Sequence, residues 1–424
     1  ATIPSVAQSA DTIKFGSILD TSGIFEAYGK PMEKTHQLAV EEINAAGGLL
    51  GRQIEMIPYD TQSNMALYTQ YARRMTRRDK VDVIHGGILS ASREAIRPTL
   101  RKAKTLYFYN TTYEGGVCDR NVFCTGTTPA QQSAILVPET IKKWGKKIYV
   151  LAADYNYGQI TTNWIRHYAK NAGGDVIQAD FFPLNVSDFG STIAKIQKAK
   201  PDMVMAVLVG AAHLSFYRQW AAAGMNRKIP VASTTMSSGN DHRILTASEG
   251  DGIMVCQSFS PEADIPSVKT FLTAYKKRFG NTDDIHEIAA SSYDGVRLWA
   301  EGVKKAGTLD RMKVIEALET GISYTGPTGK VTIDPKTHHV THDMHLIEIK
   351  NQKLNVIKSY SQIPPSDTQA VCDLQKNPDD TQQYEINQLK SACWILGKGR
   401  RPPNGSRCSR RLRDPLHDRV SGAD

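Results

Sequence analysis

The sequence lacks the patterns by which several classes of protein are recognised. It has no run of 18 or more uncharged apolar residues, so it predicts no membrane-spanning helix. It contains no Gly-x-Ser-x-Gly, no phosphate-binding loop, no His-Glu-x-x-His and no Gly-x-Gly-x-x-Gly motif. The pair His286-Glu287 lacks a second histidine four residues on from the first. These absences disfavour an enzyme, and we predict no catalytic residues and no cofactor.

Cysteine is also scarce, with six in 424 residues. No Cys-x-x-Cys pair occurs, which leaves a zinc site or a thioredoxin-type site without support. Cys118 and Cys124 are separated by five residues, and we predict that they close a small disulfide loop, which export would permit. Cys256 lies in an apolar strand and is predicted to be a buried thiol. The remaining cysteines show no partner in the sequence: Cys372, Cys393 and Cys408.

Positive charge is sparse in most of the chain, although the formal net charge is +9. Residues 389–424 hold nine Lys or Arg and three Asp or Glu, a net charge of +6, so the first 388 residues carry only +3. The body therefore offers no electrostatic case for nucleic acid, and we predict no nucleic-acid partner. The basic tail has no apolar period and is predicted to be disordered. A cloning or frame error would produce a similar stretch.

The first ten residues are small and polar and end in Ala-Gln-Ser-Ala. They resemble the end of a secretory signal with its small-residue cleavage site, so we predict an exported protein. A frayed N-terminus is the alternative.

Two halves of the chain repeat the same alternation of short apolar runs and helical stripes. Such alternation predicts an α/β fold with a parallel, doubly wound sheet in each half. The predicted strands cover 13–19, 53–59, 81–85 and 106–109, then 147–152, 176–182, 201–208 and 229–232. The predicted helices cover 32–46, 64–78 and 90–103, then 135–144, 160–171, 189–199 and 213–223.

A late group of helices and a late hairpin follow the two halves. The helices are predicted over 267–279, 285–306 and 309–319, and the hairpin over 330–333, 345–350 and 354–360. Late elements of this kind suggest that the chain crosses back between two hinged lobes. We predict residues 11–132 and 263–325 for the first lobe, 133–262 and 326–365 for the second, and 366–388 as a C-terminal extension.

Polar loops follow most of the predicted strands. Open parallel sheets bind ligands at the carboxyl ends of their strands, where these loops converge. The loops are rich in neutral hydrogen-bonding residues, which favours a small polar ligand with little net charge, although ordinary cap and turn chemistry is the alternative for each. They cover residues 20–23, 88–92, 109–115, 154–158, 210–212 and 233–238.

Two features of these loops stand out. Ser90 is expected at the start of a helix, where its hydroxyl and the nearby backbone N–H groups can meet a carbonyl or carboxylate oxygen. A plain N-cap would use the same hydroxyl inward. The segment 107–116 combines three tyrosines, an asparagine, two threonines and a glutamate, and we interpret it as one wall of a binding cleft.

Four histidines lie close together near the predicted hairpin: His338, His339, His342 and His345. Such a cluster suggests a metal site. However, Pro335 and the hairpin pattern place the histidines on a loop without a helical carboxylate–histidine motif. We therefore predict a solvated turn and no metal site.

The order of motifs resembles a known family. Ile-Lys-Phe-Gly near the start, Ala39-Val-Glu-Glu-Ile-Asn-Ala-Ala-Gly-Gly48 and Gly51-Arg-Gln-Ile-Glu are similar to type I periplasmic solute-binding proteins of the Leu/Ile/Val-receptor class. The resemblance covers about residues 11–361. Tyr109-Asn-Thr-Thr-Tyr-Glu-Gly115 is similar to the Tyr-Pro-x-x-Tyr-Glu-Gly segment of the urea-receptor and amide-sensor branch, with Asn110 in place of the proline. Ile88 likewise stands where the amide sensor has a tyrosine.

The resemblance implies two α/β lobes joined by three crossovers that close on a ligand. By resemblance, Ser90, Tyr109 and Thr111 would line the first-lobe side of the site. We also predict that Asn110 and Tyr113 of the segment 107–116 bind the ligand. The second-lobe side would be formed by Tyr155, Tyr157 and Thr235.

The implied function is that of a periplasmic receptor that passes a small polar solute to the membrane permease of an ABC transporter. Residues 233–238 contain no acidic residue that could meet an amino-acid ammonium, and Asp154 is the only nearby candidate, which favours urea or a short amide. An amino-acid receptor is the alternative ligand class. A ligand sensor that regulates a protein partner, and a hydrolase-like enzyme that uses Ser90, are alternatives of other classes.

Overall fold

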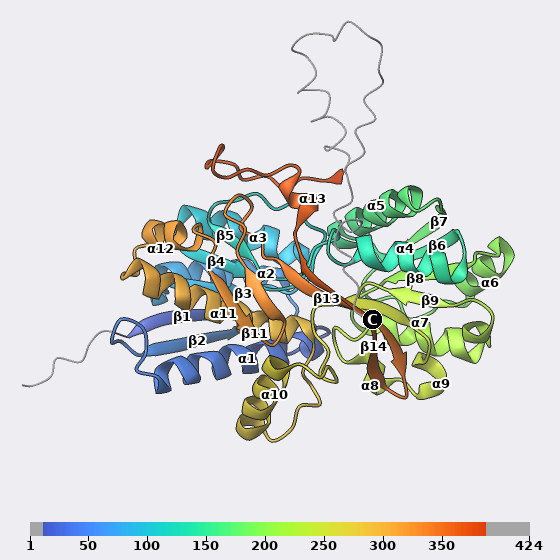
Figure 1. Ribbon diagram of the computed structural model, residues 1–424, viewed down its shortest axis with the longest axis horizontal. Coiled ribbons are helices and arrows are strands. Elements are labelled where there is room, and N and C mark those ends of the chain that lie inside the picture. Colours follow the sequence, from blue (N-terminus) through green and yellow to red (C-terminus); the bar gives the residue numbers. More distant parts are fainter. Residues whose placement is uncertain (1–11, 387–424) are drawn as a thin grey trace, which may run out of the picture. The chain divides into compact units, whose positions relative to one another are not determined.

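Apolar strands and amphipathic helices form two α/β lobes, each built around its own sheet. The computed structural model describes residues 12–386. The predicted signal remnant, the basic tail, Cys393 and Cys408 lie outside the described residues. Figure 1 shows the early elements of the first lobe in blue and cyan beside the orange helices α11 (Glu287–Ala306) and α12 (Arg311–Leu318), and most of the second lobe in green.

The first lobe is organised around a five-stranded parallel sheet with the strand order β2-β1-β3-β4-β5. Its strands are almost wholly buried at the centre, as continuous apolar runs with helices on both faces require. Strand β5, which has three residues, is too short to show a pattern in the sequence and was not predicted. The strands are β1 (Ile13–Leu19), β2 (Ile54–Asp60), β3 (Val83–Gly86), β4 (Leu106–Tyr109) and β5 (Val122–Cys124).

Helices from the beginning and from the late part of the sequence cover this sheet. The long helix α11 packs against both α1 and α12, so distant parts of the chain build one lobe. Helix α1 starts six residues before the predicted position and carries Pro31 inside it, where the missing N–H costs one backbone hydrogen bond. The helices are α1 (Glu26–Ala45), α2 (Met65–Arg74), the π-helical turn η1 (Met75–Asp79), α3 (Ser90–Lys102), α10 (Pro266–Phe279), α11 (Glu287–Ala306) and α12 (Arg311–Leu318).

The second lobe is organised around a seven-stranded sheet with the order β14-β13-β10-β9-β8-β6-β7. Five of its strands are parallel, and the late hairpin of β13 and β14 joins it antiparallel to β10. The strands are β6 (Lys147–Ala153), β7 (Asp175–Phe182), β8 (Met203–Val207), β9 (Val231–Ser233), β10 (Met254–Gln257), β13 (His342–Lys350) and β14 (Lys353–Ile363).

The helices of the second lobe follow the predicted pattern, with one change that bears on the site. The predicted loop 154–158 is largely helical, because α5 begins at Asn156 with Tyr155 as its N-cap residue. The helices are α4 (Ser133–Trp144), α5 (Asn156–Asn171), α6 (Gly190–Ala199), α7 (Ala211–Ala222), the 3₁₀ turn η2 (Met225–Arg227), α8 (Asp241–Ile244) and α9 (Ala247–Gly250).

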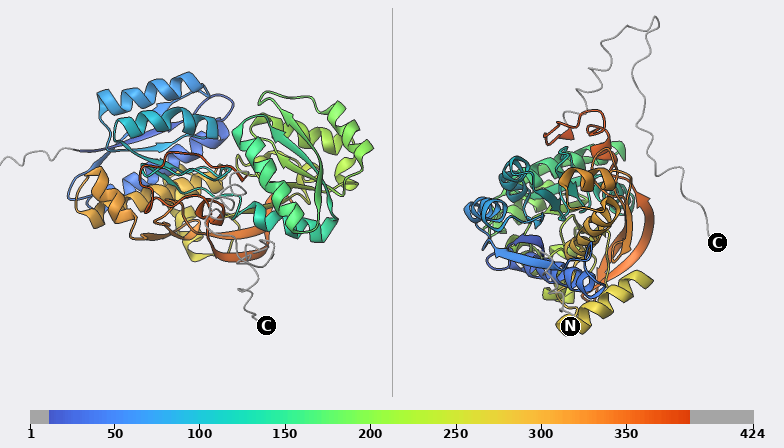
Figure 2. Two further views of the ribbon diagram at one scale, coloured as in Figure 1. Left: turned by 90° about the horizontal axis from the view of Figure 1, so that it is seen from above. Right: turned by 90° about the vertical axis from the view of Figure 1, so that its left-hand side faces the viewer.

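The late part of the chain passes from the first lobe to the sheet of the second lobe (Figure 2). Strands β11 (Ser323–Gly326) and β12 (Gly329–Thr332) form a separate two-stranded sheet, and β11 contacts α11. His339 then forms a parallel bridge with Cys124 of β5, so residues just before β13 contact the first lobe. The division of the chain into lobes at residues 132, 262, 325 and 365 stays a prediction.

The four clustered histidines are buried, so the predicted solvated turn was wrong. The ring of His338 stacks on Phe123 with 4.1 Å between the ring centroids, and His342 Nε2 lies 2.9 Å from the carbonyl oxygen of Thr125. Burial lowers the pKa of His342 to about 4 and keeps the ring neutral, although its contact with Thr125 acts in the opposite direction. Within residues 12–386, no group of three or more His, Cys, Asp or Glu is placed to hold a metal ion.

The disulfide prediction was also wrong, because Cys118 pairs with Cys372 across 254 residues. Cys124 points from β5 into the apolar cluster of the first lobe and is a buried free thiol, so it cannot reach Cys118. Cys256 is a buried free thiol, as predicted.

Residues 366–386 return from β14 to the first lobe, and we name them the C-terminal clasp. They include the short helix α13 (Ser366–Gln369). Backbone hydrogen bonds join the clasp to the loop after β4, from Tyr384 N to Gly116 O at 2.8 Å and from Cys118 N to Gln382 O at 2.9 Å. The disulfide therefore fixes one end of a contact that hydrogen bonds continue.

No helix within residues 12–386 is long and apolar enough to cross a membrane.

Candidate ligand-binding cleft

A cavity lies where loops of both lobes meet at the carboxyl ends of the parallel strands. Its empty volume is about 420 Å³ when the space open to solvent is included. This is the position at which open α/β sheets bind ligands. The lining residues are Phe25, Tyr28, Ile88, Leu89, Ser90, Thr111, Thr112, Tyr155, Tyr157, Val209, Thr235, Ser238 and Ile288.

Ser90 and Thr111 line the first-lobe wall of the cavity, and their role in binding stays a prediction. Ser90 is the first residue of α3 and is not its N-cap; Leu89 takes that place and caps without a side chain. The Ser90 hydroxyl therefore does not turn inward to the helix. It donates instead to the carboxylate of Glu114, and the Thr111 hydroxyl donates to the carbonyl oxygen of Gly87 at 3.0 Å.

These contacts fix the polarity of the first-lobe wall. A serine or threonine hydroxyl has one proton to donate and two lone pairs that accept. Because Ser90 and Thr111 give their protons to protein acceptors, they face the cavity with lone pairs only. This wall therefore offers hydrogen-bond acceptors to a ligand.

The second-lobe wall has a different polarity. Thr235 donates to the carbonyl oxygen of Leu208 at 2.6 Å, but no side-chain hydrogen bond joins the hydroxyl of Tyr155 or Ser238 to another residue within 12–386. Tyr157 and Thr234 share a hydrogen bond of 3.0 Å. Tyr155 and Ser238 therefore have protons to donate into the cavity.

Three predicted site residues lie outside the cavity lining. Tyr109 donates to the carbonyl oxygen of Ile88 at 2.9 Å, and Asn110 Nδ2 donates to Thr125 Oγ1 at 2.6 Å. Tyr113 packs on the ring of His339 and bonds to it. These side chains support the wall from within the first lobe instead of facing the cavity.

Several lining residues escaped the sequence analysis. Phe25 and Tyr28 come from the segment that enters α1, just beyond the loop 20–23 that was singled out. Tyr28 Oη accepts a hydrogen bond of 3.0 Å from Gly210 N, which belongs to the second lobe. Ile88 and Ile288 add apolar surface. An aromatic pair just after a polar loop was the available signal for Phe25 and Tyr28.

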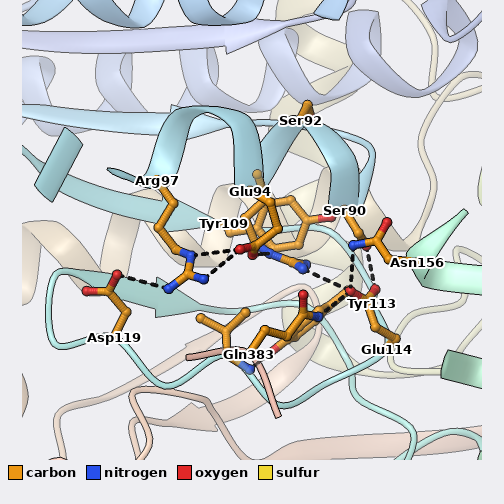
Figure 3. A network of polar contacts seen from close by, with 12 residues as sticks. Ser90, Ser92, Glu94, Arg97, Tyr109, Tyr113, Glu114, Asp119, Asn156 and Gln383 are labelled. Atoms are coloured by element: carbon orange, nitrogen blue, oxygen red, sulfur yellow. Dashed lines mark hydrogen bonds and ion pairs between the residues drawn. The ribbon is translucent and has the colours of Figure 1, made fainter. Parts of the chain in front are cut away.

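A buried ion pair stands directly behind the first-lobe wall (Figure 3). Arg93 and Glu114 are both fully buried, with 2.8 Å between Arg93 Nη2 and Glu114 Oε1. The guanidinium also stacks on the rings of Tyr109 and Tyr113. Burial alone would lower the pKa of Arg93, but the carboxylates of Glu114 and Glu94 raise it well above the ordinary value.

None of the lining residues carries a charged side chain, and one acidic residue, Asp241, lies near Tyr28 of the lining. Asp241 is buried, and its Oδ2 has no hydrogen-bond partner within residues 12–386. Burial and then the nearby Asp241 raise the pKa of Tyr28. Asp154, the acidic residue suggested by the sequence, is exposed instead.

Comparison with protein families matches residues 12–353 to the family described as "Periplasmic binding protein". The match spans most of the chain. This protein belongs to the periplasmic binding protein family.

Two relatives of this periplasmic binding protein are named for amino-acid ligands. It is 23% identical to the Leu/Ile/Val-binding protein homolog 6 of Brucella melitensis, over 81% of this chain and 89% of that protein. It is 26% identical to the leucine-, isoleucine-, valine-, threonine- and alanine-binding protein of Pseudomonas aeruginosa, over 78% of this chain and 88% of that protein.

A solved structure of similar fold comes from Rhodopseudomonas palustris BisB5. It is a solute-binding protein of an ABC transporter in complex with 3,4-dihydroxybenzoic acid, with 23% identity and a TM-score of 0.76. The alignment covers 84% of this chain and 99% of the other. The two-lobed α/β fold expected from the sequence is confirmed. The ligands in the names of these proteins are amino acids and a benzoate, not urea or an amide.

Proposed function

We propose that this protein is the exported receptor of an ABC importer, and that it captures a short-chain amide between its lobes and delivers it to the membrane permease. The family match supports solute binding, and the hydrogen-bond polarity of the cavity supports the ligand class. No covalent chemistry is needed, because a ligand that contacts both lobes favours their closed state by its differential affinity.

The observation that carries the ligand class is the donation of the Ser90 and Thr111 protons to protein acceptors. A ligand group that meets these two hydroxyls must itself donate, as an amide NH₂ does. Across the cavity, the hydroxyl of Tyr155 has a proton to give to a carbonyl oxygen. An amide carries both functions on one carbon atom.

The apolar part of the lining separates short amides from urea. Phe25, Ile88, Leu89, Val209 and Ile288 contact the same space, and urea has no apolar atoms to place against them. A chain of two or three carbons buries apolar surface there at about 0.8 kcal/mol per CH₂ group. A benzoate fits less well, since no lysine or arginine within residues 12–386 lines the cavity to pair with its carboxylate.

Branched-chain amino acids are the second candidate ligand. The names of the relatives favour them, and the apolar lining suits their side chains. Asp241, whose Oδ2 lies 3.8 Å from His213 Nδ1, adds a buried acidic group close to the cleft. An amino acid would place its carboxylate at the N-terminus of α3, where backbone N–H groups and the helix dipole favour an anion.

Calorimetric titration of the full chain with propionamide, butyramide, urea, leucine and benzoate tests the ligand class. We expect the two amides to bind more tightly than urea and benzoate. Tyr155→Phe should weaken amide binding about three- to tenfold, because it removes one hydrogen bond worth about 1 kcal/mol. The control Tyr71→Phe, a tyrosine of α2 that stacks on Tyr59, should bind as the wild type does.

Binding of leucine without binding of either amide would replace the first ligand class with the second. Binding of none of the solutes would overturn both. Full retention of amide affinity in Tyr155→Phe would show that this hydroxyl does not reach the ligand.

A further inference from the structure

We infer that Glu114 is a positioning residue that makes Ser90 a hydrogen-bond acceptor and that also holds the two lobes together through Asn156. This inference deepens the proposed function, since it names the residue that sets which ligand group the first-lobe wall accepts. Glu114 does not line the cavity, so its effect passes through other side chains.

Glu114 lies five residues beyond the end of β4 and is completely buried. Its Oε2 atom accepts the proton of Ser90. Its Oε1 atom lies 2.8 Å from Arg93 Nη2 and 3.4 Å from Asn156 Nδ2, and also accepts from Gln383 Nε2. Figure 3 shows Ser90 of α3, Asn156 of α5 and Gln383 of the C-terminal clasp around the carboxylate of Glu114.

The two oxygen atoms of Glu114 therefore have separate tasks. Among residues 12–386, Oε1 receives three donors, which are Arg93, Asn156 and Gln383, whereas Oε2 receives only the hydroxyl of Ser90. A carboxylate paired with a guanidinium accepts and does not donate. Ser90 must consequently be the donor in their contact, so its lone pairs face the cavity.

The contact with Asn156 joins the lobes. Asn156 is the first residue of α5 in the second lobe, next to the cavity residue Tyr155. The carboxylate of Glu114 thus contacts Ser90 of the first-lobe wall and Asn156 of the second lobe. Asn156 is the neighbour of Tyr155, which lines the second-lobe wall. Closure of the lobes and the arrangement of Ser90 depend on one group.

The C-terminal clasp holds Glu114 in place. Gly116 N donates to Thr368 Oγ1 at 3.0 Å, and the disulfide of Cys118 with Cys372 lies four residues beyond Glu114. Gln383 adds a direct side-chain contact. The loop that carries Glu114 is therefore fixed from behind, which keeps the carboxylate at the cleft.

Glu114→Gln tests the effect on polarity with almost no change in shape. The three donors at Oε1 keep the carboxamide oxygen on their side, so the NH₂ group takes the place of Oε2 and faces Ser90. Ser90 then accepts from Gln and turns its own proton towards the cavity. The first-lobe wall gains a donor and becomes better suited to a carboxylate.

The measurement is calorimetric affinity of the full chain for propionamide and for propionate. We expect the wild type to prefer propionamide, and the ratio of the two affinities to fall at least tenfold in Glu114→Gln. The control Glu94→Gln removes another carboxylate that pairs with Arg93 but does not touch Ser90, and it should keep the wild-type ratio. An unchanged ratio in Glu114→Gln would overturn the role of Glu114 in polarity.

A second measurement needs no ligand. The hydrogen bond from Gly210 N to Tyr28 Oη crosses the cleft, so hydrogen–deuterium exchange of a peptide that covers Gly210 reports opening of the lobes. Asn156→Ala should speed this exchange several-fold, whereas Asn171→Ala, at the other end of α5, should not. Equal exchange in the wild type and Asn156→Ala would overturn the role in closure.

The two measurements separate the two proposals. If the wild type binds neither propionamide nor propionate, the proposed ligand class fails, and exchange at Gly210 in Asn156→Ala still decides the role of Glu114 in closure. Faster exchange supports it, and wild-type exchange overturns it.

Discussion

The two lobes present similar loops to the cleft but place different chemistry behind them. In the first lobe, buried polar and charged side chains lie next to the cavity residues Ser90 and Thr111: Arg93, Asn110 and Glu114. In the second lobe, the main cluster that supports the sheet is apolar and aromatic: Tyr149, Leu151, Phe189, Phe216, Trp220 and Val255.

The difference suggests a division of labour in recognition. Buried hydrogen bonds have fixed directions, so the first lobe can hold Ser90 and Thr111 in one hydrogen-bonding state. An apolar cluster fixes shape but not direction. The second lobe accordingly keeps hydroxyl groups that can rotate, such as those of Tyr155 and Ser238. We interpret the first lobe as the selective half of the site and the second as the half that closes over the ligand.

The largest effect is expected when the buried ion pair is broken. Arg93→Met should lower the free energy of unfolding by about 3–5 kcal/mol, because it leaves the carboxylate of Glu114 buried without its main partner. The matched change in the second lobe, Leu151→Met, preserves volume and should cost less than about 1.5 kcal/mol. Urea unfolding of both variants measures the difference.

A further variant sharpens this comparison. Arg93→Met combined with Glu114→Gln removes the unpaired charge as well as its partner, and should recover part of the lost stability. Equal costs for Arg93→Met and Leu151→Met would show that the polar cluster of the first lobe is not under greater constraint than the apolar core of the second.

Removing the disulfide is expected to have the next largest effect. Replacing Cys118 and Cys372 by serine should cost about 2–4 kcal/mol, since the bridge closes a very long loop of the unfolded chain. The loss should concentrate in the first lobe, because the clasp contacts that lobe. Hydrogen exchange should rise in peptides that cover 113–119 and stay unchanged around β8 of the second lobe. A uniform rise in both lobes would contradict this assignment.

The sequence was sufficient for the architecture because the strands and helices of both lobes carry long, regular patterns. The apolar run at β8 and the amphipathic pattern of α11 depend only on neighbouring residues. Contacts between distant residues were not accessible in this way. The pairing of Cys118 with Cys372 spans 254 residues, and local spacing favoured the wrong partner, Cys124.

The site was predicted in part for the same reason. Ser90, Thr111, Tyr155, Tyr157 and Thr235 follow strand ends and do line the cavity. Their roles in binding stay predictions. The direction of each side chain was not readable from the sequence, so Tyr109, Asn110 and Tyr113 were grouped with them although they point into the first lobe.

The same limit explains why the role of Glu114 was not predicted from the sequence. It belongs to the Tyr-Glu-Gly segment that suggested the amide branch, yet nothing in the sequence indicates that Arg93, Asn156 and Gln383 converge on it. Such convergence depends on residues from three parts of the chain.

The last effect concerns acid stability and disappears above about pH 6.5, and it tests the cost of burying polar groups. Burial lowers the pKa of His342 to about 4 in the folded protein, against about 6.5 in the unfolded chain. Below pH 6.5 the unfolded chain binds the additional proton, so this contribution to stability is complete above pH 6.5 and is lost as the pH falls towards 4. His342→Gln should reduce the slope of unfolding free energy against pH in that range by up to about 1.4 kcal/mol per pH unit.

Asp294 provides a counterpart of opposite sign. Burial raises its pKa to about 7, although hydrogen bonds from Thr328 act against this, so between about pH 4 and 7 the folded protein binds more protons than the unfolded chain. Its contribution is therefore complete at low pH and is lost as the pH rises through that range. Asp294→Asn should make the loss of stability towards acid steeper, whereas His342→Gln should make it shallower. Urea unfolding at half-unit steps from pH 4 to 7.5 measures both slopes, and a change of the same sign in the two variants would contradict the neutral state of these buried groups.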